Sequence, residues 1–298
     1  MAANSSSSSS REPRTIALHV GPIAPGLHVV ATPIGNLADV TLRALTTLSA
    51  ADLVLCEDTR ITRRLFDRYG IKTPLLAYHD HNAAAVRPKM LARLGEGAKI
   101  ALVSDAGTPL VSDPGYKLVE AALDAGHRVF PIPGPSAALA ALVAAGLPTD
   151  RFFFDGFLPA KGGQRRTRVA ELAAIPATLV LYESGPRLAA SLADLARGLG
   201  VRHASVCREL TKTFEEVRRG TLSALAEHYQ VAGAPKGEIV VVIAPPAKAV
   251  TSADELDSKL HDALARSSVK DAVAEVAQET GLARREVYAR ALALGGKR

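Results

Sequence analysis

Residues 27–37 read LHVVATPIGNL, and this stretch decides the fold. The apolar, β-branched run Leu27–Ala31 predicts a buried strand, and the Pro, Gly and Asn that follow it predict a tight loop at the carboxyl end of that strand. The amphipathic segment Asp39–Ser49 then predicts a helix. Strand, loop and helix in this order indicate an α/β layer structure.

Outward from this stretch, the same succession repeats through the first half of the chain. Further strands are expected at Leu53–Cys56, Lys99–Ser104 and Val129–Pro131, and further helices at Ile61–Tyr69, Ala84–Leu94, Tyr116–Ala125 and about Ser136–Leu147. Leu147-Pro148-Thr149 then interrupts the pattern. We therefore expect a first α/β domain over residues 25–149, after a flexible, serine-rich tail over residues 1–24.

A second series of alternating segments follows. Its expected strands are Phe152–Phe157, Thr178–Tyr182, Ala204–Arg208, Glu216–Arg219 and Glu238–Ile243, and its expected helices are Thr167–Ala174, Leu188–Gly198 and Leu222–Tyr229. Pro245-Pro246 is typical of a linker. This series predicts a second α/β domain over residues 150–247.

Residues 250–298 predict a small helical module. Ser252 and Glu255 form a capping box at the start of its first helix, whose leucines share one face. A second helix is expected from Ser268 to about Thr280, and a third, after a turn at Gly281, at Arg284–Leu294. Helix, Gly-containing turn and helix match the helix-turn-helix outline. A helical bundle that only packs or dimerises explains the pattern equally well.

The composition excludes several classes of protein. Of 298 residues, 48% are hydrophobic and 22% are charged, as in an ordinary folded protein, which excludes wholesale disorder, collagen and coiled coil. Aromatic residues make up only 4%, with no Trp, so an aromatic stacking platform for single-stranded RNA is not expected. The net charge of +6 mildly favours a polyanionic partner.

The cysteines and the longest charge-free stretch bear on the compartment. Cys56 and Cys207 stand far apart without a CxxC pair, which argues against a zinc site or a disulfide scaffold and favours a reducing cytoplasm. Pro and Gly break the stretch Val129–Thr149, and its helical part is shorter than the roughly 20 residues that cross a bilayer. We expect a cytoplasmic protein without a membrane partner.

Polar loops follow four of the expected strands, at Thr32–Leu37, Glu57–Arg60, Asp105–Pro109 and Pro133–Ala137. Turn chemistry alone accounts for any one of them. Because ligands bind at the carboxyl ends of strands in open α/β sheets, four such loops together predict a pocket for a small polar ligand. The motifs GxxxxGK[ST], GxGxxG, GxSxG and HExxH are absent, which argues against nucleoside triphosphate, nicotinamide, serine hydrolase and zinc protease sites.

Four motifs carry a resemblance to a known family. They are Val30–Asp39, Cys56–Arg60, Ser104–Pro109 with Ser112–Gly115, and Pro133–Ala137. In this order they resemble the tetrapyrrole methylase superfamily and, more narrowly, its 16S rRNA cytidine 2′-O-methyltransferases. The resemblance covers about residues 27–245. Around Val269–Leu292 the chain also resembles that family's terminal helix-turn-helix-like module, with less specific motifs.

The resemblance implies a fold and a cofactor. The fold is a pair of α/β domains with a deep cleft between them, and the cofactor is S-adenosylmethionine, with no metal. The cofactor-binding residues that it implies are Pro33, Ser104, Asp105, Thr108, Ser136 and Ala137 from the first domain, and Tyr182 and Leu210 from the second. A sulfonium ion is already positive, so carbonyls, hydroxyls and a carboxylate suit it better than Lys or Arg. Asp105 would bind the methionyl amine or a ribose hydroxyl, or alternatively cap its own turn.

The resemblance also implies the substrate and the assembly. The substrate is a cytidine ribose of 16S rRNA in an assembled or nearly assembled 30S subunit, and the protein is a homodimer. Two other hypotheses remain: methylation of a tetrapyrrole or another small molecule, and an RNA-binding or assembly factor whose cofactor site is vestigial.

Transfer of a methyl group to a ribose oxygen needs alignment and a base. The base candidates in the matching motifs are Glu57, Asp58 and Glu209, whereas Arg60 and Lys161 are candidates for orienting phosphate or stabilising negative charge. Each has a structural alternative. Glu57 and Asp58 would pair with neighbouring arginines, and Lys161 would be a solvated loop residue. The sequence leaves this choice open.

A basic cluster is a candidate RNA-binding segment. Lys161, Arg165, Arg166 and Arg168 follow or flank Gly162-Gly163, which predicts a mobile positive loop that reaches RNA phosphates. A solvated helix start is the alternative. The two histidines of His79-Asp80-His81 lack a second ligand cluster, so we expect loop residues or RNA contacts there, and no metal.

Overall fold

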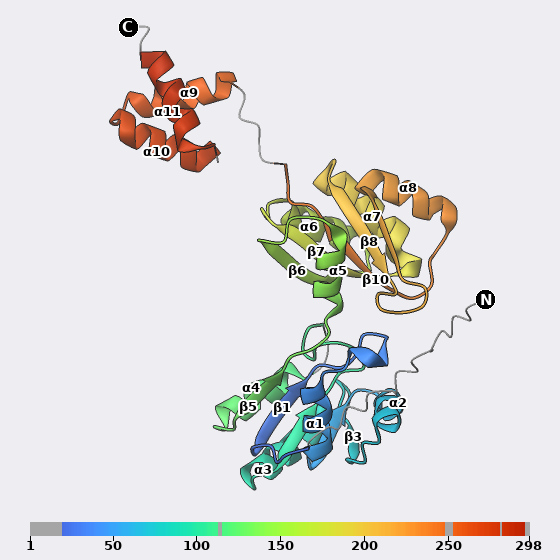
Figure 1. Ribbon diagram of the computed structural model, residues 1–298. Coiled ribbons are helices and arrows are strands. Elements are labelled where there is room, and N and C mark those ends of the chain that lie inside the picture. The colour runs from blue at the N-terminus through green and yellow to red at the C-terminus, as the bar shows by residue number, and fades with distance from the viewer. Residues whose placement is uncertain (1–19, 113–114, 248–252, 281, 296–298) are drawn as a thin grey trace, which may run out of the picture.

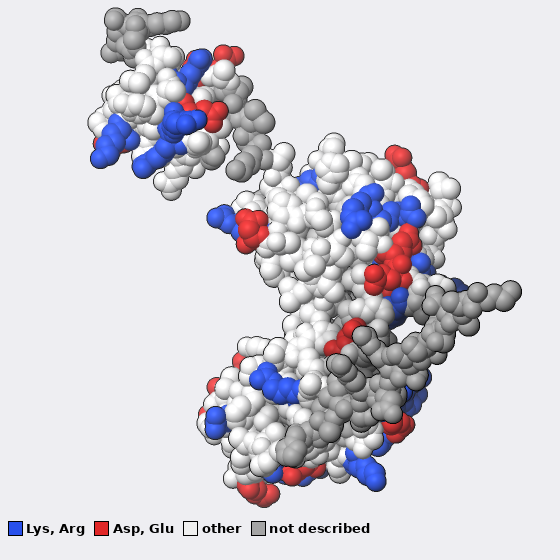
Figure 2. Space-filling model, in the orientation of Figure 1, with Lys and Arg blue, Asp and Glu red and all other residues white. Residues whose placement is uncertain are grey.

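The computed structural model describes residues 20–112, 115–247, 253–280 and 282–295. Figure 1 shows three bodies in chain order: an α/β domain (blue to green), a second α/β domain (green to orange) and a helical module (red). Figure 2 shows Lys and Arg as well as Asp and Glu on the visible face of each of the three bodies. The expected α/β class is confirmed. Residues 1–19, Asp113-Pro114, Ser252 of the capping box and the turn at Gly281 lie outside the described residues.

The first sheet has the strand order β3-β2-β4-β1-β5, and all its pairings are parallel. Its strands are β1 (Gly26–Val30), β2 (Leu53–Cys56), β3 (Leu75–Ala77), β4 (Lys99–Leu102) and β5 (Val129–Ile132). Its helices are α1 (Leu42–Ala50), α2 (Thr59–Tyr69), α3 (Ala83–Gly95) and α4 (Tyr116–Asp124). Helices α1 and α2 bury apolar residues on one face of the sheet, and α3 and α4 on the other. All five strands therefore end at the same edge.

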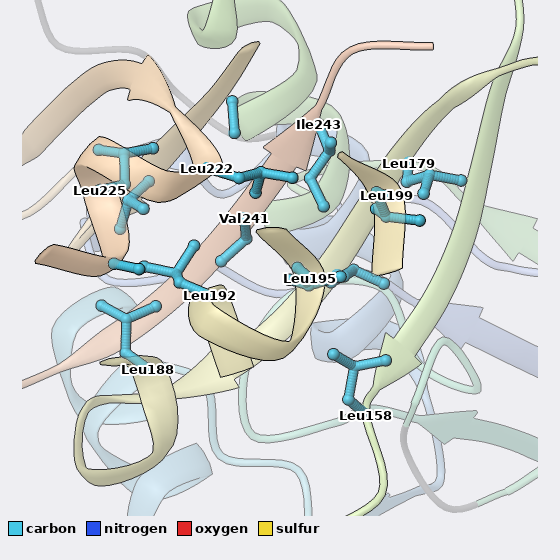
Figure 3. Packing of buried hydrophobic residues seen from close by; sticks show 14 of the residues in the cluster. Leu158, Leu179, Leu188, Leu192, Leu195, Leu199, Leu222, Leu225, Val241 and Ile243 are labelled. Carbon is cyan, nitrogen blue, oxygen red and sulfur yellow. The ribbon is translucent and has the colours of Figure 1, made fainter. Parts of the chain in front are cut away.

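The second sheet has the order β6-β7-β10-β8-β9 and is mixed: β6 and β7 are parallel, and the other pairings are antiparallel. Its strands are β6 (Phe152–Phe157), β7 (Thr178–Ser184), β8 (His203–Arg208), β9 (Glu216–Thr221) and β10 (Glu238–Ile243). Helices α6 (Gly162–Ala173), α7 (Gly185–Leu199) and α8 (Leu222–Ala232) cover one face. Figure 3 shows leucines of α7 and α8 pointing toward Val241 and Ile243 of β10.

Helix α5 (Ala137–Ala145) covers the other face of the second sheet. It follows β5 of the first domain, yet its buried residues Ala141 and Leu142 belong to a core with Val180 of β7 and Val242 of β10. An alanine-rich helix allows close packing on β-branched strand residues, because small side chains let the backbones approach. Helix α5 therefore attaches the first domain to the second sheet. The domain boundary at residues 149/150 stays a prediction.

Most expected elements are present with shifted ends. The expected helix Asp39–Ser49 is divided into a 3-10 turn, η1 (Leu37–Asp39), and α1, because Thr41 caps the amide of Ala44 and restarts the helix. Strand β3 was not expected from the sequence. It has three half-buried residues at the sheet edge, which is too short for a periodic pattern.

The C-terminal module is a three-helix unit of α9 (Ala253–Leu264), α10 (Val269–Thr280) and α11 (Arg284–Gly295), as expected from the sequence. Leu260, Val276 and Val287 meet in its core. Arg290 of α11 donates to Asp257 of α9, which ties the first and third helices together. No helix within the described ranges is long and apolar enough to cross a membrane.

Candidate functional site

A cavity of about 350 Å³ lies where the strand-end loops of the two α/β domains meet. This volume falls within the roughly 300–1,000 Å³ of small-molecule sites. The first domain contributes the loops after β1 and β4 and the start of α5, and the second contributes β6, β7, β8 and β10. The lining residues singled out from the sequence are Asp105, Thr108, Ser136, Ala137, Tyr182 and Leu210.

The loop after β4 is held in place by its own hydrogen bonds. Thr32 pairs with Gly107 in an antiparallel bridge, and the Thr32 hydroxyl donates to the Ser104 carbonyl at 3.2 Å. Ser104 is buried and its hydroxyl donates to the carbonyl of Ala106 at 3.2 Å. Ser104 and Pro33 are not among the lining residues. Their expected contact with the cofactor stays a prediction, and in this structure Ser104 supports the loop whose next residues form the wall.

Backbone strain is concentrated in two loops that border the cavity. Leu110 and Ser112, after β4, have φ of 73° and 65°, and Glu209 and Thr211, after β8, have φ of 50° and 67°. Residues with side chains rarely adopt this left-handed conformation unless the surroundings enforce it. Both domains therefore present a constrained loop to the site.

Asp105 provides a carboxylate at the cavity wall. Its Oδ1 accepts a hydrogen bond from the backbone N–H of Asp58 at 2.9 Å. Burial raises the pKa of Asp105, and the nearby Asp58 carboxylate adds to this rise. The described lining includes no Lys or Arg. A cationic ligand group would therefore meet a carboxylate on a wall without Lys or Arg, and the positive charge that acts on Asp105, that of Arg60, lies outside the lining.

The second domain provides an apolar wall. The ring of Tyr182 contacts Phe157 edge to face, with centroids 5.5 Å apart, and Leu210 is buried beside them. Cys207 also lines the cavity, and burial raises the pKa of its thiol to about 11. The thiol therefore stays protonated near neutral pH and contributes an apolar surface rather than a nucleophile.

The three base candidates have different environments. Asp58 caps α2 and pairs with Arg60 at 2.6 Å, and this hydrogen bonding lowers the pKa of Asp58 to about 2. In contrast, burial raises the pKa of Glu57, and the Asp105 carboxylate raises it further. Glu57 is therefore a better proton acceptor near neutral pH than Asp58, because a base works best when its pKa approaches the operating pH.

Glu209 is part of a lysine-centred network. Lys212 Nζ donates to Glu209 Oε1 at 2.7 Å and to Glu238 Oε2 at 2.9 Å, and Glu209 also accepts from the Glu238 amide at 3.0 Å. The bond with Lys212 lowers the pKa of Glu209. A low pKa weakens Glu209 as a base, and its contacts give it a structural role beside the cavity.

The same network joins the two domains. The Asn36 amide donates to Thr211 Oγ1 at 3.2 Å, and a Cβ on Gly35 would lie 2.5 Å from Lys212 Cγ. Gly237, with φ of +100°, lies so close to Glu209 that a Cβ there would be 2.4 Å from the carboxyl carbon. Sequence reasoning missed the role of Lys212 and of Gly237, because the contacts of Lys212 with Gly35 and of Gly237 with Glu209 join distant parts of the chain.

The basic cluster is corrected in part. Residues 162–173 form helix α6, not a mobile loop. Arg165 is 9% exposed and pairs with Asp194 of α7 at 2.7 Å, so its guanidinium is not available to RNA. Arg168 pairs with Asp155 and Glu171. Lys161 and Arg166 remain exposed.

Comparisons with known proteins agree with this geometry. Residues 26–226 match the model of the tetrapyrrole (corrin/porphyrin) methylases, and residues 250–295 match the model described as the RsmI C-terminal HTH domain. A protein of Mesorhizobium japonicum named ribosomal RNA small subunit methyltransferase I is 56% identical over 274 residues, covering 92% of this chain and 93% of the relative. A protein of the same name from Xylella fastidiosa is 47% identical, covering 89% and 98%.

Solved structures show the same fold at low sequence identity. Diphthine synthase matches with a TM-score of 0.58 and 18% identity, covering 73% of this chain and 89% of that one. The cobalamin biosynthetic enzyme cobalt precorrin-4 methyltransferase matches with a TM-score of 0.55 and 19% identity, covering 72% and 93%. The chain therefore belongs to the tetrapyrrole methylase family and, within it, to the group of the ribosomal RNA small subunit methyltransferases I.

Proposed function

We propose that this chain transfers the methyl group of S-adenosylmethionine to small-subunit rRNA, at the 2′-oxygen of a cytidine ribose. One observation carries the proposal: the interdomain cavity combines a carboxylate, hydroxyls and an apolar wall with no Lys or Arg in its described lining. That cavity occurs in a chain 56% identical to a relative named ribosomal RNA small subunit methyltransferase I.

The residues around the cavity fit S-adenosylmethionine. When bound, the cofactor supplies an electrophilic methyl group on a positively charged sulfur. Asp105 offers a carboxylate for the ammonium or a ribose hydroxyl, and Thr108 and Ser136 offer hydroxyls. The ring of Tyr182 and the side chain of Leu210 offer apolar surface for the adenine.

The residues of this chain contribute mainly alignment. In-line transfer would gain much of its rate from holding the acceptor oxygen opposite the carbon–sulfur bond that breaks, so that the neutral thioether leaves as the oxygen–carbon bond forms. The loops after β4 and β8 hold the lining residues in fixed backbone conformations. Glu57, with its raised pKa, accepts the ribose hydroxyl proton, and Arg60, whose side chain is 87% exposed, binds an RNA phosphate near this proton acceptor.

Further parts of the proposal concern the partners. Lys161 and Arg166, which are exposed at the start of α6, bind RNA phosphates. A second copy of the chain forms a homodimer. The exposed apolar residues Leu139 and Val143 of α5 support a protein contact of this kind. The free, buried Cys56 and Cys207 are consistent with the cytoplasm as the compartment.

The test is transfer of labelled methyl from S-adenosylmethionine to 30S subunits, naked 16S rRNA and a tetrapyrrole precursor in parallel. Mass spectrometry then separates ribose from base products. Label on a cytidine ribose in the 30S sample supports the proposal. Label only on the tetrapyrrole, or on no substrate, contradicts it.

A further inference from the structure

The exposed side of helix α2 carries a group of arginines, of which the proposed function uses only Arg60. Its sequence TRITRRLFDRY places Arg60, Arg64 and Arg68 four residues apart, with Arg63 beside them. Residues four apart lie on one side of a helix. Leu65 and Phe66 lie on the buried side. We call these four arginines the α2 arginine face.

The α2 arginine face is only partly neutralised by carboxylates of the protein. Arg63, Arg64 and Arg68 are exposed, and no ion pair is found for them among the described residues, whereas Arg60 pairs with Asp58. One carboxylate, Asp67, shares this side of the helix. Like charges four residues apart repel and destabilise a helix, so folding alone does not favour this arrangement.

Both ends of α2 are fixed to loops of the site. At its start, the amide of Asp58 donates to Asp105 at 2.9 Å, and Asp105 lines the cavity. At its end, the Tyr69 hydroxyl donates to the carbonyl of Leu37 at 2.8 Å, within the loop region after β1. The arginine face therefore extends from the cavity wall along the outer surface of the first domain.

We propose that the α2 arginine face binds the phosphate backbone of the RNA strand whose ribose enters the cavity, which rests on the proposed function. Guanidinium groups bind phosphate with paired hydrogen bonds. The cavity lining itself includes acidic residues that repel phosphate, namely Asp105, Glu183 and Glu238. Arginines on the adjacent helix offset this repulsion and hold the strand while the carboxylates remain available to a cationic cofactor.

The test compares two matched double variants. Arg64→Gln/Arg68→Gln removes two charges from the face, and Lys89→Gln/Lys117→Gln removes two charges from exposed positions on α3 and α4 of the same domain. Binding to 30S subunits and to naked 16S rRNA is measured by filter binding between about 50 and 200 mM salt. Calorimetry measures S-adenosylmethionine binding for each protein.

We expect the arginine variant to lose about tenfold or more in RNA affinity at low salt. Its plot of log affinity against log salt should flatten by about 1 for each phosphate that the variant no longer binds. Cofactor affinity should not change, and Arg64→Lys/Arg68→Lys should restore the salt slope because the charges return. The proposal is overturned if the arginine variant and the lysine-site variant have the same RNA affinity and the same salt slope. Loss of 30S binding without a change in salt slope or in naked RNA binding also overturns it, because it indicates a ribosomal protein contact.

Failure of the proposed function gives a different result. If the unsubstituted protein methylates no RNA ribose, the activity assignment is wrong whatever the binding data show. If it methylates 30S subunits and the arginine variant matches the lysine-site control in salt slope and affinity, only the placement of RNA on α2 is wrong.

Discussion

The two α/β domains differ in how they use their charged side chains. Within the described part of residues 25–149, one ion pair is found, Arg60 with Asp58. The second domain has nine, which include Arg165 with Asp194 and Lys212 with Glu209. Charges in the second domain mainly hold its elements together. Charges in the first domain are left available, which suits a domain that meets ligands.

The largest expected effect is the loss of stability when the buried ion pair of the second domain is broken. Asp194→Ala leaves Arg165 buried without its carboxylate, since the two side chains are 10% and 5% exposed. We expect a loss of about 3–5 kcal/mol in the free energy of unfolding, because an unpaired buried charge is costly. Denaturant unfolding followed by circular dichroism measures it.

The matched control for this variant uses the same carboxylate. Arg197 also pairs with Asp194, but its side chain is 67% exposed. Arg197→Ala should cost below about 1 kcal/mol, as exposed ion pairs do. Equal losses in the two variants would show that burial does not set the strength of these pairs. If Asp194→Ala does not fold, Arg165→Met/Asp194→Leu should fold, because it removes both charges.

The next largest effect is expected for Asp105, a first-domain carboxylate that forms no ion pair among the described residues. Asp105→Asn should weaken S-adenosylmethionine binding by about 1.5–3 kcal/mol, the usual contribution of a hydrogen bond to a charged group. Calorimetry measures this loss. Glu120→Gln, which changes an exposed carboxylate on α4, is the control and should bind as the unsubstituted protein does.

The pH dependence of binding sharpens the assignment of Asp105. Burial raises the pKa of Asp105 above its ordinary value of 3.8, and a cationic cofactor prefers the ionised form. Proton and cofactor therefore compete, so affinity should rise as pH increases through this pKa and level off above it. Asp105→Asn should lose this component of the pH dependence. A profile identical to that of the unsubstituted protein would remove Asp105 from the cofactor site.

A smaller effect on RNA affinity is expected for the arginines of α6, and it should differ between an arginine without an ion pair among the described residues and one with an ion pair. Arg166→Gln should lower RNA affinity several-fold and flatten the salt slope by about 1, because Arg166 is exposed. Arg168→Gln should leave the slope unchanged, because Asp155 and Glu171 already neutralise this guanidinium. Filter binding on 30S subunits measures both. A larger loss of RNA affinity in Arg168→Gln than in Arg166→Gln would contradict the proposed role of the start of α6.

The smallest effect is expected for the stability of the first domain. Arg63→Gln should change the free energy of unfolding by less than about 0.5 kcal/mol, since Arg63 is exposed and has no ion pair among the described residues. Denaturant unfolding of Arg63→Gln and Asp194→Ala under the same conditions compares their losses in the free energy of unfolding. A loss comparable with that of Asp194→Ala would show that α2 arginines serve the fold.

The sequence predicted most of the fold and the first-domain wall of the cavity. The loops after β1 and β4 were recognisable because Pro, Gly and Asp directly follow short apolar runs, and Asp105 and Thr108 do line the cavity. Strand β3 was missed because three residues at a sheet edge show no periodicity. Pro33 and Ser104 were expected in the wall itself, but neither lines the cavity, and Ser104 supports the wall from behind.

The charged residues of the site were harder to predict. Arg165 and Arg166 are neighbours in one basic run, yet the first is buried against Asp194 and the second is exposed. Their orientation depends on which side of α6 faces α7, and a short run with mixed periodicity does not reveal that side. Likewise, nothing near Lys212 in the sequence indicates its closeness to Gly35.

The sequence by itself determined the order of strands and helices and the polar loops at the strand ends, because these depend on local periodicity and turn chemistry. Only the tertiary structure decided which charges are free and how the cavity is closed. Arg165 and Asp194 are 29 residues apart, and Asn36 and Thr211 are 175 apart. Electrostatic pairing depends on distance in space, and the packing of α5 and α7 on the second sheet sets that distance.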